Sequence, residues 1–222
     1  MPGVVAYTFD DGPGIYNDLL LSKLASKNVT ATFFVLGSMI AANTDGLKKI
    51  LDHGHQLASH TYTHRSLDDM SVGLMQQEMN ATADIMFKYS GIRPRYMRAP
   101  EGRCEKTCLK VMADLGYVVT HWNVDTNDWR YKDEKNPQVA VNKSMKEVNE
   151  AIVKKSDPAK DSFIILQHEI HKFSVEYLVD AVVDAVQKKG YRFVSIEECI
   201  GKPAYMDGSV VPATSHKHTH YF

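Results

Sequence analysis

The chain contains 222 residues, of which 44% are hydrophobic and 24% are charged, a composition typical of an ordinary folded protein. Its 26 basic and 27 acidic side chains nearly cancel, which excludes a bulk attraction to nucleic acid or to anionic lipid. The longest weakly polar run, at 31–42, is too short for a membrane helix, which needs roughly 20 apolar residues. Intrinsic disorder, a coiled coil and a membrane span are therefore not expected.

Strand-like and helix-like segments alternate along the whole chain. The predicted strands are 4–9, 30–35, 56–59, 95–98, 117–123, 162–167 and 191–195, and the predicted helices are 18–27, 46–53, 71–89, 105–115, 137–154 and 175–189. This alternation predicts a parallel α/β fold, either a barrel or an open sheet. No linker divides the chain, so we expect one domain at 1–202 and a loop-like tail at 203–222. The tail histidines, at 216, 218 and 220, are expected to be solvated rather than to bind a metal.

The cysteines bear on the cellular environment of the protein. Cys104 and Cys108 are four residues apart, which on a helix places them roughly 6 Å from each other, within reach of a disulfide; two unrelated thiols are the alternative. Cys199 would then be unpaired or would pair outside this chain. N-glycosylation sequons begin at Asn28, Asn80 and Asn142. These features favour an oxidising, secretory origin. No signal peptide is visible at the start, so an intracellular protein and a trimmed mature domain both stay open.

Polar motifs follow five of the predicted strands, where α/β barrels and sheets carry their functional residues. These motifs are Thr-Phe-Asp-Asp-Gly-Pro at 8–13, Ser-His-Thr-Tyr-Thr-His at 59–64, Arg-Ala-Pro-Glu-Gly at 98–102, Asp-Thr-Asn-Asp-Trp at 125–129 and Leu-Gln-His at 166–168. Each alone has an ordinary explanation, because paired acids can cap a helix and paired histidines more often decorate a surface. Five such motifs, each directly after a strand, are poorly explained by coincidence.

The residue types in these motifs suit metal-assisted hydrolysis of an acyl bond. One carboxylate of the tandem acids and the histidines His60 and His64 would form a ligand face that leaves positions open for water and substrate. The second carboxylate would then lie beside the attacking water as a base. A histidine across the pocket could protonate the leaving group.

The five motifs, in this order and at these intervals, resemble those of the NodB-homology polysaccharide deacetylases, carbohydrate esterase family 4. The resemblance extends from about residue 4 to residue 200. The segment 121–129, together with Cys104 and Cys108, looks most like fungal chitin deacetylases. The resemblance implies a distorted, TIM-like (β/α)7 barrel with the NodB-homology fold.

The resemblance also implies a role for each matching residue. Asp10 corresponds to the catalytic base, Arg98 to the arginine that holds it, His168 to the catalytic acid, Asp125 to the carboxylate that tunes this acid, Asp11, His60 and His64 to the metal ligands, and Leu166 and Trp129 to the walls of the acetyl pocket. Glu101 departs from the family, which usually has an aromatic residue there. We expect this glutamate to favour neutral or partly deacetylated, cationic chains.

The implied activity is a metal-dependent hydrolysis of C–N bonds other than peptide bonds. It would remove N-acetyl groups from N-acetylglucosamine residues of chitin or chitooligosaccharides and give chitosan and acetate. Zinc (Zn2+) is the expected metal, with cobalt (Co2+) or another divalent ion as the alternative. Acetylxylan or peptidoglycan as substrate, and a non-catalytic glycan-binding protein, are the alternative functions. We also expect a monomer that is secreted or associated with the cell wall.

Overall fold

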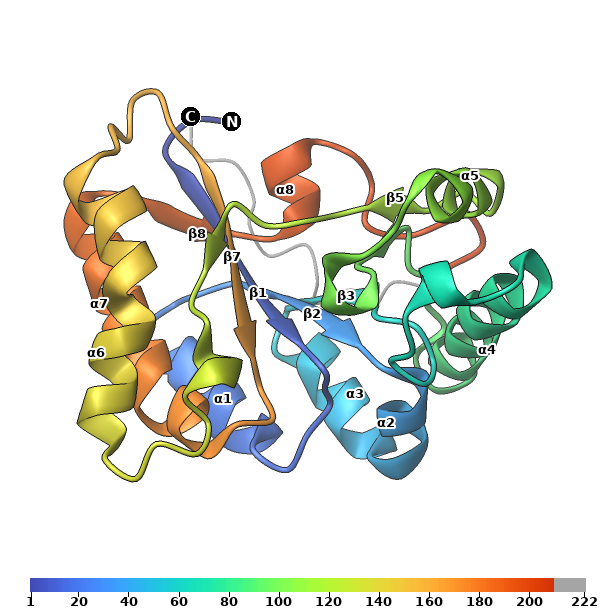
Figure 1. The fold of residues 1–222 in the computed structure, drawn as a ribbon, viewed down its shortest axis with the longest axis horizontal. Coiled ribbons are helices and arrows are strands. Elements are labelled where there is room, and N and C mark those ends of the chain that lie inside the picture. The colour runs from blue at the N-terminus through green and yellow to red at the C-terminus, as the bar shows by residue number, and fades with distance from the viewer. Residues whose placement is uncertain (210–222) are drawn as a thin grey trace.

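Strand β1 (Val4–Asp10) lies at the centre of the fold and is buried along its whole length. The computed structural model describes residues 1–209 of the chain. The apolar run from Val4 to Phe9 suits a parallel strand that is covered on both faces. β1 pairs in parallel with β2 (Thr32–Val35) and with β7 (Phe163–His168), as Figure 1 shows. The first acids of the predicted site therefore stand at the end of the central strand.

The sheet is parallel and curled, with the order β5-β4-β3-β2-β1-β7-β6, and the last strand, β8, pairs with the beginning of β1. The remaining strands are β3 (Gln56–Ser59), β4 (Tyr96–Met97), β5 (Val118–Val119), β6 (Val124–Asp125) and β8 (Arg192–Val194). This arrangement confirms the predicted distorted barrel of α/β type.

The predicted strand at 117–123 is instead two short strands on opposite edges of the sheet. The amide of Thr120 donates to the carbonyl of Met97 on β4 at 2.8 Å, whereas the amide of Asn123 donates to the carbonyl of Ile164 on β7 at 3.1 Å. The backbone at 120–123 thus crosses from one edge to the other, which Figure 1 shows between β5 and the neighbourhood of β7. The backbone itself therefore connects the two edge strands β5 and β6, which in a closed barrel would be joined by hydrogen bonds.

Helices surround the sheet, and four of them begin at a residue whose side chain caps the first turn. The helices are α1 (Asn17–Ser26), α2 (Gly37–Ala42), α3 (Thr44–Asp52), α4 (Val72–Ser90), α5 (Lys106–Asp114), α6 (Pro137–Val148), α7 (Val179–Lys189) and α8 (Ile196–Ile200). The hydroxyl oxygen of Ser71 caps α4, and Gly91, with a φ of 73°, ends it in the left-handed conformation. The short helices α2 and α8 were not predicted. Within residues 1–209 no helix is both long and apolar enough to cross a membrane.

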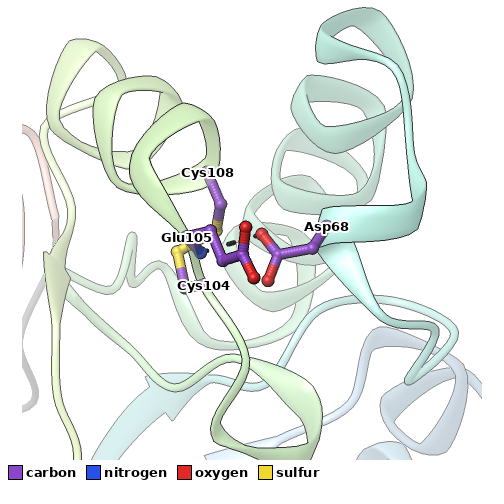
Figure 2. The surroundings of a disulfide bond; sticks show 4 residues. All are labelled: Asp68, Cys104, Glu105 and Cys108. Atoms are coloured by element: carbon purple, nitrogen blue, oxygen red, sulfur yellow. Dashed lines mark hydrogen bonds between the residues drawn. A yellow bond between two sulfur atoms is a disulfide. The ribbon is translucent and has the colours of Figure 1, made fainter.

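A disulfide joins Cys104 and Cys108 at the start of α5, as predicted, with 5.1 Å between their Cα atoms. Figure 2 shows its surroundings, in which the Asp68 carboxylate accepts a hydrogen bond from the amide of Glu105 at 2.8 Å. Asp68 belongs to the short helix η1 (Leu67–Asp69), which follows the motif at 59–64 that carries His60 and His64. The loop after that motif is therefore tied to the start of α5. Cys199 has no disulfide partner within 1–209.

The first residues of the predicted tail pack on the domain. Tyr205 forms an isolated antiparallel bridge with Pro94, and its hydroxyl oxygen accepts a hydrogen bond from the amide of Leu57 at 3.2 Å. Ala204 is buried. The segment predicted as tail from 203 onward thus contributes to the folded unit at its beginning. The tail histidines, at 216, 218 and 220, lie outside the described residues.

Candidate active site

A cavity of about 580 Å³ opens where the strands of the sheet end. The tandem acids reach it from the end of β1, the two histidines from the loop after β3, and His168 from the end of β7. Every residue that the sequence placed in the site lines this cavity except Arg98, which is fully buried behind Asp10. The parallel arrangement therefore brings together motifs that lie far apart in the chain.

Asp11, His60 and His64 form a compact cluster of possible metal ligands. Their ligand atoms all lie within 4.8 Å of one another. The Asp11 Oδ1 atom is 3.5 Å from Nε2 of His60 and 3.4 Å from Nε2 of His64. Ligand atoms that bind a tetrahedral ion at about 2.0–2.2 Å lie roughly 3.4 Å from one another. The separations fit a single small divalent ion.

Two further observations support this fit. The Asp11 Oδ1 atom is buried and has no hydrogen-bond partner among the described residues, although an unpaired buried carboxylate oxygen is unfavourable. The Nδ1 atom of His60 lies 2.8 Å from the carbonyl oxygen of Arg98, which can only accept, so Nδ1 carries the proton and Nε2 presents its lone pair to the cluster. Burial lowers the pKa of His60 to about 4, which keeps this imidazole neutral at physiological pH.

Asp10 is fixed by a fully buried arginine. The Arg98 Nη1 atom donates to Oδ1 of Asp10 at 2.7 Å, and the guanidinium also bonds the hydroxyl of Thr8 and the carbonyl of Thr120. The guanidinium lies 4.1 Å from the ring centre of Phe34, which packs against it. Burial raises the pKa of Asp10, and Arg98 opposes this rise. The other oxygen, Oδ2, faces His60 at 3.7 Å from Nε2, so it stands beside the ligand cluster.

His168 is paired with Asp128, and not with Asp125 as predicted from the sequence. Its Nδ1 atom lies 2.7 Å from Oδ1 of Asp128, while its backbone amide donates to Oδ2 of the same residue at 2.9 Å. Burial alone would lower the pKa of His168, but the hydrogen bond and charge of Asp128 outweigh burial and raise this pKa to about 9. The imidazole is therefore charged at neutral pH, and its Nε2 atom is left for the cavity.

Asp125 lies three residues earlier, in the same motif, and makes a local bond instead. Its Oδ1 atom accepts the amide of Asn127 at 2.6 Å. Asn127 has a φ of 53°, so the chain turns there and places Asp125 and Asp128 on different sides of the turn. The assignment of Asp125 as the partner of His168 is thus corrected, although Asp125 lines the cavity.

The sequence reasoning also missed residues that complete the site. The Ser174 hydroxyl lies 2.7 Å from Oδ2 of Asp128 and is buried, which helps hold that carboxylate. His171 and Lys132 line the cavity as well. The pattern His168-Glu169-Ile170-His171 was a visible signal for His171, since it lies three residues after the predicted acid. Ser174 carried no comparable signal, because an isolated serine is common in loops.

The rim of the cavity combines apolar and charged side chains. Leu166 is buried on its wall, and Trp129 is 45% exposed at its mouth. Glu101 lines the cavity from the short helix η2 (Pro100–Gly102), where it adopts a left-handed conformation with a φ of 57°. The walls therefore offer an apolar surface beside the charged groups.

The comparisons with known proteins agree with this fold. A family model described as polysaccharide deacetylase matches residues 1–120, and the chain belongs to this family. A chitin deacetylase of Colletotrichum lindemuthianum is 33% identical over 205 residues, which cover 90% of this chain and 80% of that protein. A peptidoglycan-N-acetylglucosamine deacetylase of Listeria monocytogenes is 34% identical over 201 residues, which cover 89% of this chain and 39% of that protein.

A solved structure gives the same result. The chitin deacetylase from Colletotrichum lindemuthianum matches with a TM-score of 0.85 and 31% identity, covering 100% of this chain and 95% of that chain. The resemblance inferred from the five motifs is confirmed. The chain spans only part of some longer relatives, such as the Listeria protein.

Proposed function

We propose that this protein hydrolyses the N-acetyl groups of N-acetylglucosamine residues in chitin or chitooligosaccharides and releases acetate. The observation that carries this proposal is the placement of two catalytic groups around one cluster of ligands. Asp10 stands beside the cluster with its position fixed by Arg98, and the charged His168 lines the same cavity. A pure binding site needs neither a buried base nor a charged acid. The similarity to a chitin deacetylase supports this choice of substrate.

We further propose that Asp11, His60 and His64 hold a zinc ion, with cobalt as an effective substitute. One carboxylate and two imidazoles suit zinc and leave positions open for small ligands. When bound, such an ion supplies Lewis-acid chemistry by acidifying water and polarising the acetamide carbonyl.

Asp10 acts as the general base. Its Oδ1 atom is occupied by Arg98, so the second oxygen, beside His60, takes the proton of the attacking water. Arg98 cannot rotate away, because its guanidinium is bonded on several sides and buried. The base is therefore held at one position.

His168 acts as the general acid. An amide nitrogen leaves as an amine only after it is protonated, and a charged imidazole can deliver this proton. Asp128 holds the Nδ1 atom, so the proton moves from Nε2 to the nitrogen of the sugar. The acetyl methyl group is placed against Leu166 and Trp129, and the free amine remains on the sugar.

Acetate release from chitin oligomers, acetylxylan and peptidoglycan tests the substrate. We expect the highest kcat/KM on chitin oligomers. Fastest turnover of peptidoglycan would favour the second candidate, which the similarity to a peptidoglycan-N-acetylglucosamine deacetylase supports. No acetate from any of the three would contradict the enzyme proposal and favour a glycan-binding protein.

Glu101 is proposed to adjust the preference between acetylated and partly deacetylated chains. Its carboxylate places negative charge on the cavity wall, where it attracts the ammonium group of a deacetylated sugar. Replacing Glu101 with tyrosine should lower kcat/KM on partly deacetylated oligomers relative to fully acetylated ones by about 2–5-fold, the size of an exposed charge contact of up to ~1 kcal/mol. An unchanged ratio would refute this role.

We also propose that the protein works as a monomer outside the cell or in the cell wall. The disulfide between Cys104 and Cys108 is typical of oxidising compartments. The sequon asparagines Asn28, Asn80 and Asn142 are all exposed, so each could carry a glycan. Mass spectrometry of the protein recovered from culture medium tests for the disulfide and for the glycans.

A further inference from the structure

Both loops that carry the three ligand residues contain left-handed residues other than glycine. The φ angles are 74° at Asp11, 70° at Thr61 and 62° at His64. Side chains disfavour this conformation, and a β-branched threonine especially so. Such residues persist only where the surrounding structure fixes the backbone. Groups outside these two loops must therefore fix their backbone.

Glu169 fixes the first loop. It follows His168 directly and is fully buried. Its Oε1 atom accepts the amide of Gly14 at 2.5 Å, and its own backbone amide donates to the carbonyl of Asp10 at 3.3 Å. These two bonds bracket Asp11, which lies between Asp10 and Gly14. The second carboxylate oxygen, Oε2, is buried without a hydrogen-bond partner among the described residues, which is unfavourable for the folded protein.

Gly12 is matched to this glutamate. A Cβ atom at Gly12 would lie 1.8 Å from Oε1 of Glu169, so any side chain there would displace the carboxylate. Gly12 is not among the glycines with positive φ, so its backbone conformation does not itself require glycine. The close approach of the carboxylate accounts for the glycine at this position.

Glu78 fixes the second loop in the same way. It lies on α4, and its Oε2 atom accepts the amides of Tyr62 and Thr63 at 2.9 and 2.8 Å. Its Oε1 atom accepts the Thr63 hydroxyl at 2.8 Å. All three donors belong to the segment between His60 and His64. One carboxylate from a neighbouring element thus holds each ligand loop through its backbone.

We propose that Glu78 and Glu169 are positioning residues that preorganise Asp11, His60 and His64 and thereby set the affinity for the divalent ion. This inference rests on the metal site of the proposed function. Both glutamates act through the backbone of the loops, since their hydrogen bonds go to residues between or beside the ligands. Without them, the left-handed residues can relax and the three ligand atoms separate in the ion-free protein.

The affinity for zinc, measured by competition with a chromophoric chelator, tests this proposal. Glu78→Ala and Glu169→Ala should each weaken binding by about 10–100-fold, the usual effect of removing an outer partner of a metal site. Glu78→Gln and Glu169→Gln should bind within a few-fold of the wild-type protein, because an amide oxygen can accept the same backbone bonds. The matched control is Glu147→Ala, whose carboxylate bonds Asn127 on a loop that carries no ligand, and it should not change the affinity.

A double-mutant cycle examines the pair of Gly12 and Glu169. Gly12→Ala should weaken zinc binding about as much as Glu169→Ala, because the methyl group displaces the carboxylate. The double variant should be no worse than either single variant, since the methyl group then occupies the vacated space. The visible absorption spectrum of bound Co2+ should change in the alanine variants and be preserved in the glutamine variants. Thermal unfolding confirms that each variant is folded.

The outcomes separate this inference from the proposed function. Alanine variants that bind zinc like the wild-type protein, with an unchanged Co2+ spectrum, would overturn the positioning role alone. Equal losses in the alanine and glutamine variants would also overturn it, because the backbone bonds would then not be the cause. If the wild-type protein binds no zinc, or if the Asp11→Asn variant binds zinc as tightly as the wild-type protein, the proposed metal site is overturned and this inference with it.

Discussion

Asp10→Asn is expected to lower kcat for acetate release by about 10²–10⁴-fold, the usual contribution of a general base. The asparagine amide oxygen can still accept the hydrogen bond that Arg98 donates to Asp10 at 2.7 Å, so the fold should be kept. The amide cannot take a proton from water at the position beside His60. Turnover at saturating substrate and zinc, compared with the wild-type protein, measures this loss.

Zinc binding distinguishes the base from a ligand. The Asp10→Asn variant should still bind zinc, because Asp11, His60 and His64 are unchanged. Asp18→Asn, which alters an exposed ion pair with Lys49, is the matched control and should leave kcat unchanged. If Asp10→Asn releases acetate at the wild-type rate, Asp10 is not the base.

Asp128→Asn is expected to move the alkaline limb of the pH–kcat profile to lower pH. His168 has a pKa of about 9, so the acid form is present below pH 9 and is lost as the pH rises through this value. Removing the Asp128 charge leaves burial, which is the largest influence and lowers the pKa of His168, opposed only by the weaker charges of Asp10 and Asp11. The limb should therefore fall toward the ordinary imidazole value of about 6.5. At pH 8 the charged fraction, and with it kcat, should then drop by up to about 30-fold.

Asp125→Asn is the matched control for this prediction. Asp125 is also an acid of the cavity wall, but its Oδ1 atom bonds the amide of Asn127 and not His168. Its substitution should leave the alkaline limb close to that of the wild-type protein. A limb that moves with Asp125→Asn and stays with Asp128→Asn would restore the assignment made from the sequence.

The contrast between these two acids shows what a single sequence can predict about the site. The five motifs could be placed at one mouth because parallel strands bring their ends to the same edge of a sheet. The cluster of Asp11, His60 and His64 follows from this rule and from ligand chemistry. The choice between Asp125 and Asp128 depends on a left-handed turn at Asn127, which the order of residues does not reveal.

The fold, like the site, could be predicted only in part from the sequence. The central strands, rich in β-branched and aromatic residues, and the capped helices were predicted close to their observed positions. The split of 117–123 into β5 and β6 was not predicted, because the crossing depends on backbone bonds to Met97 and Ile164, which are distant in sequence. The roles of Glu78 and Glu169 were not predicted either, because each depends on hydrogen bonds to the backbone of a loop that the sequence pattern does not place beside it.

Acetate release from chitin oligomers before and after removal of divalent ions tests the central claim, that one ion between Asp11, His60 and His64 supports catalysis. We predict that a chelator abolishes the rate and that one equivalent of zinc per chain restores it in the wild-type protein but not in an Asp11→Asn variant. A rate that is insensitive to the chelator, or that zinc restores equally in both proteins, would contradict this account.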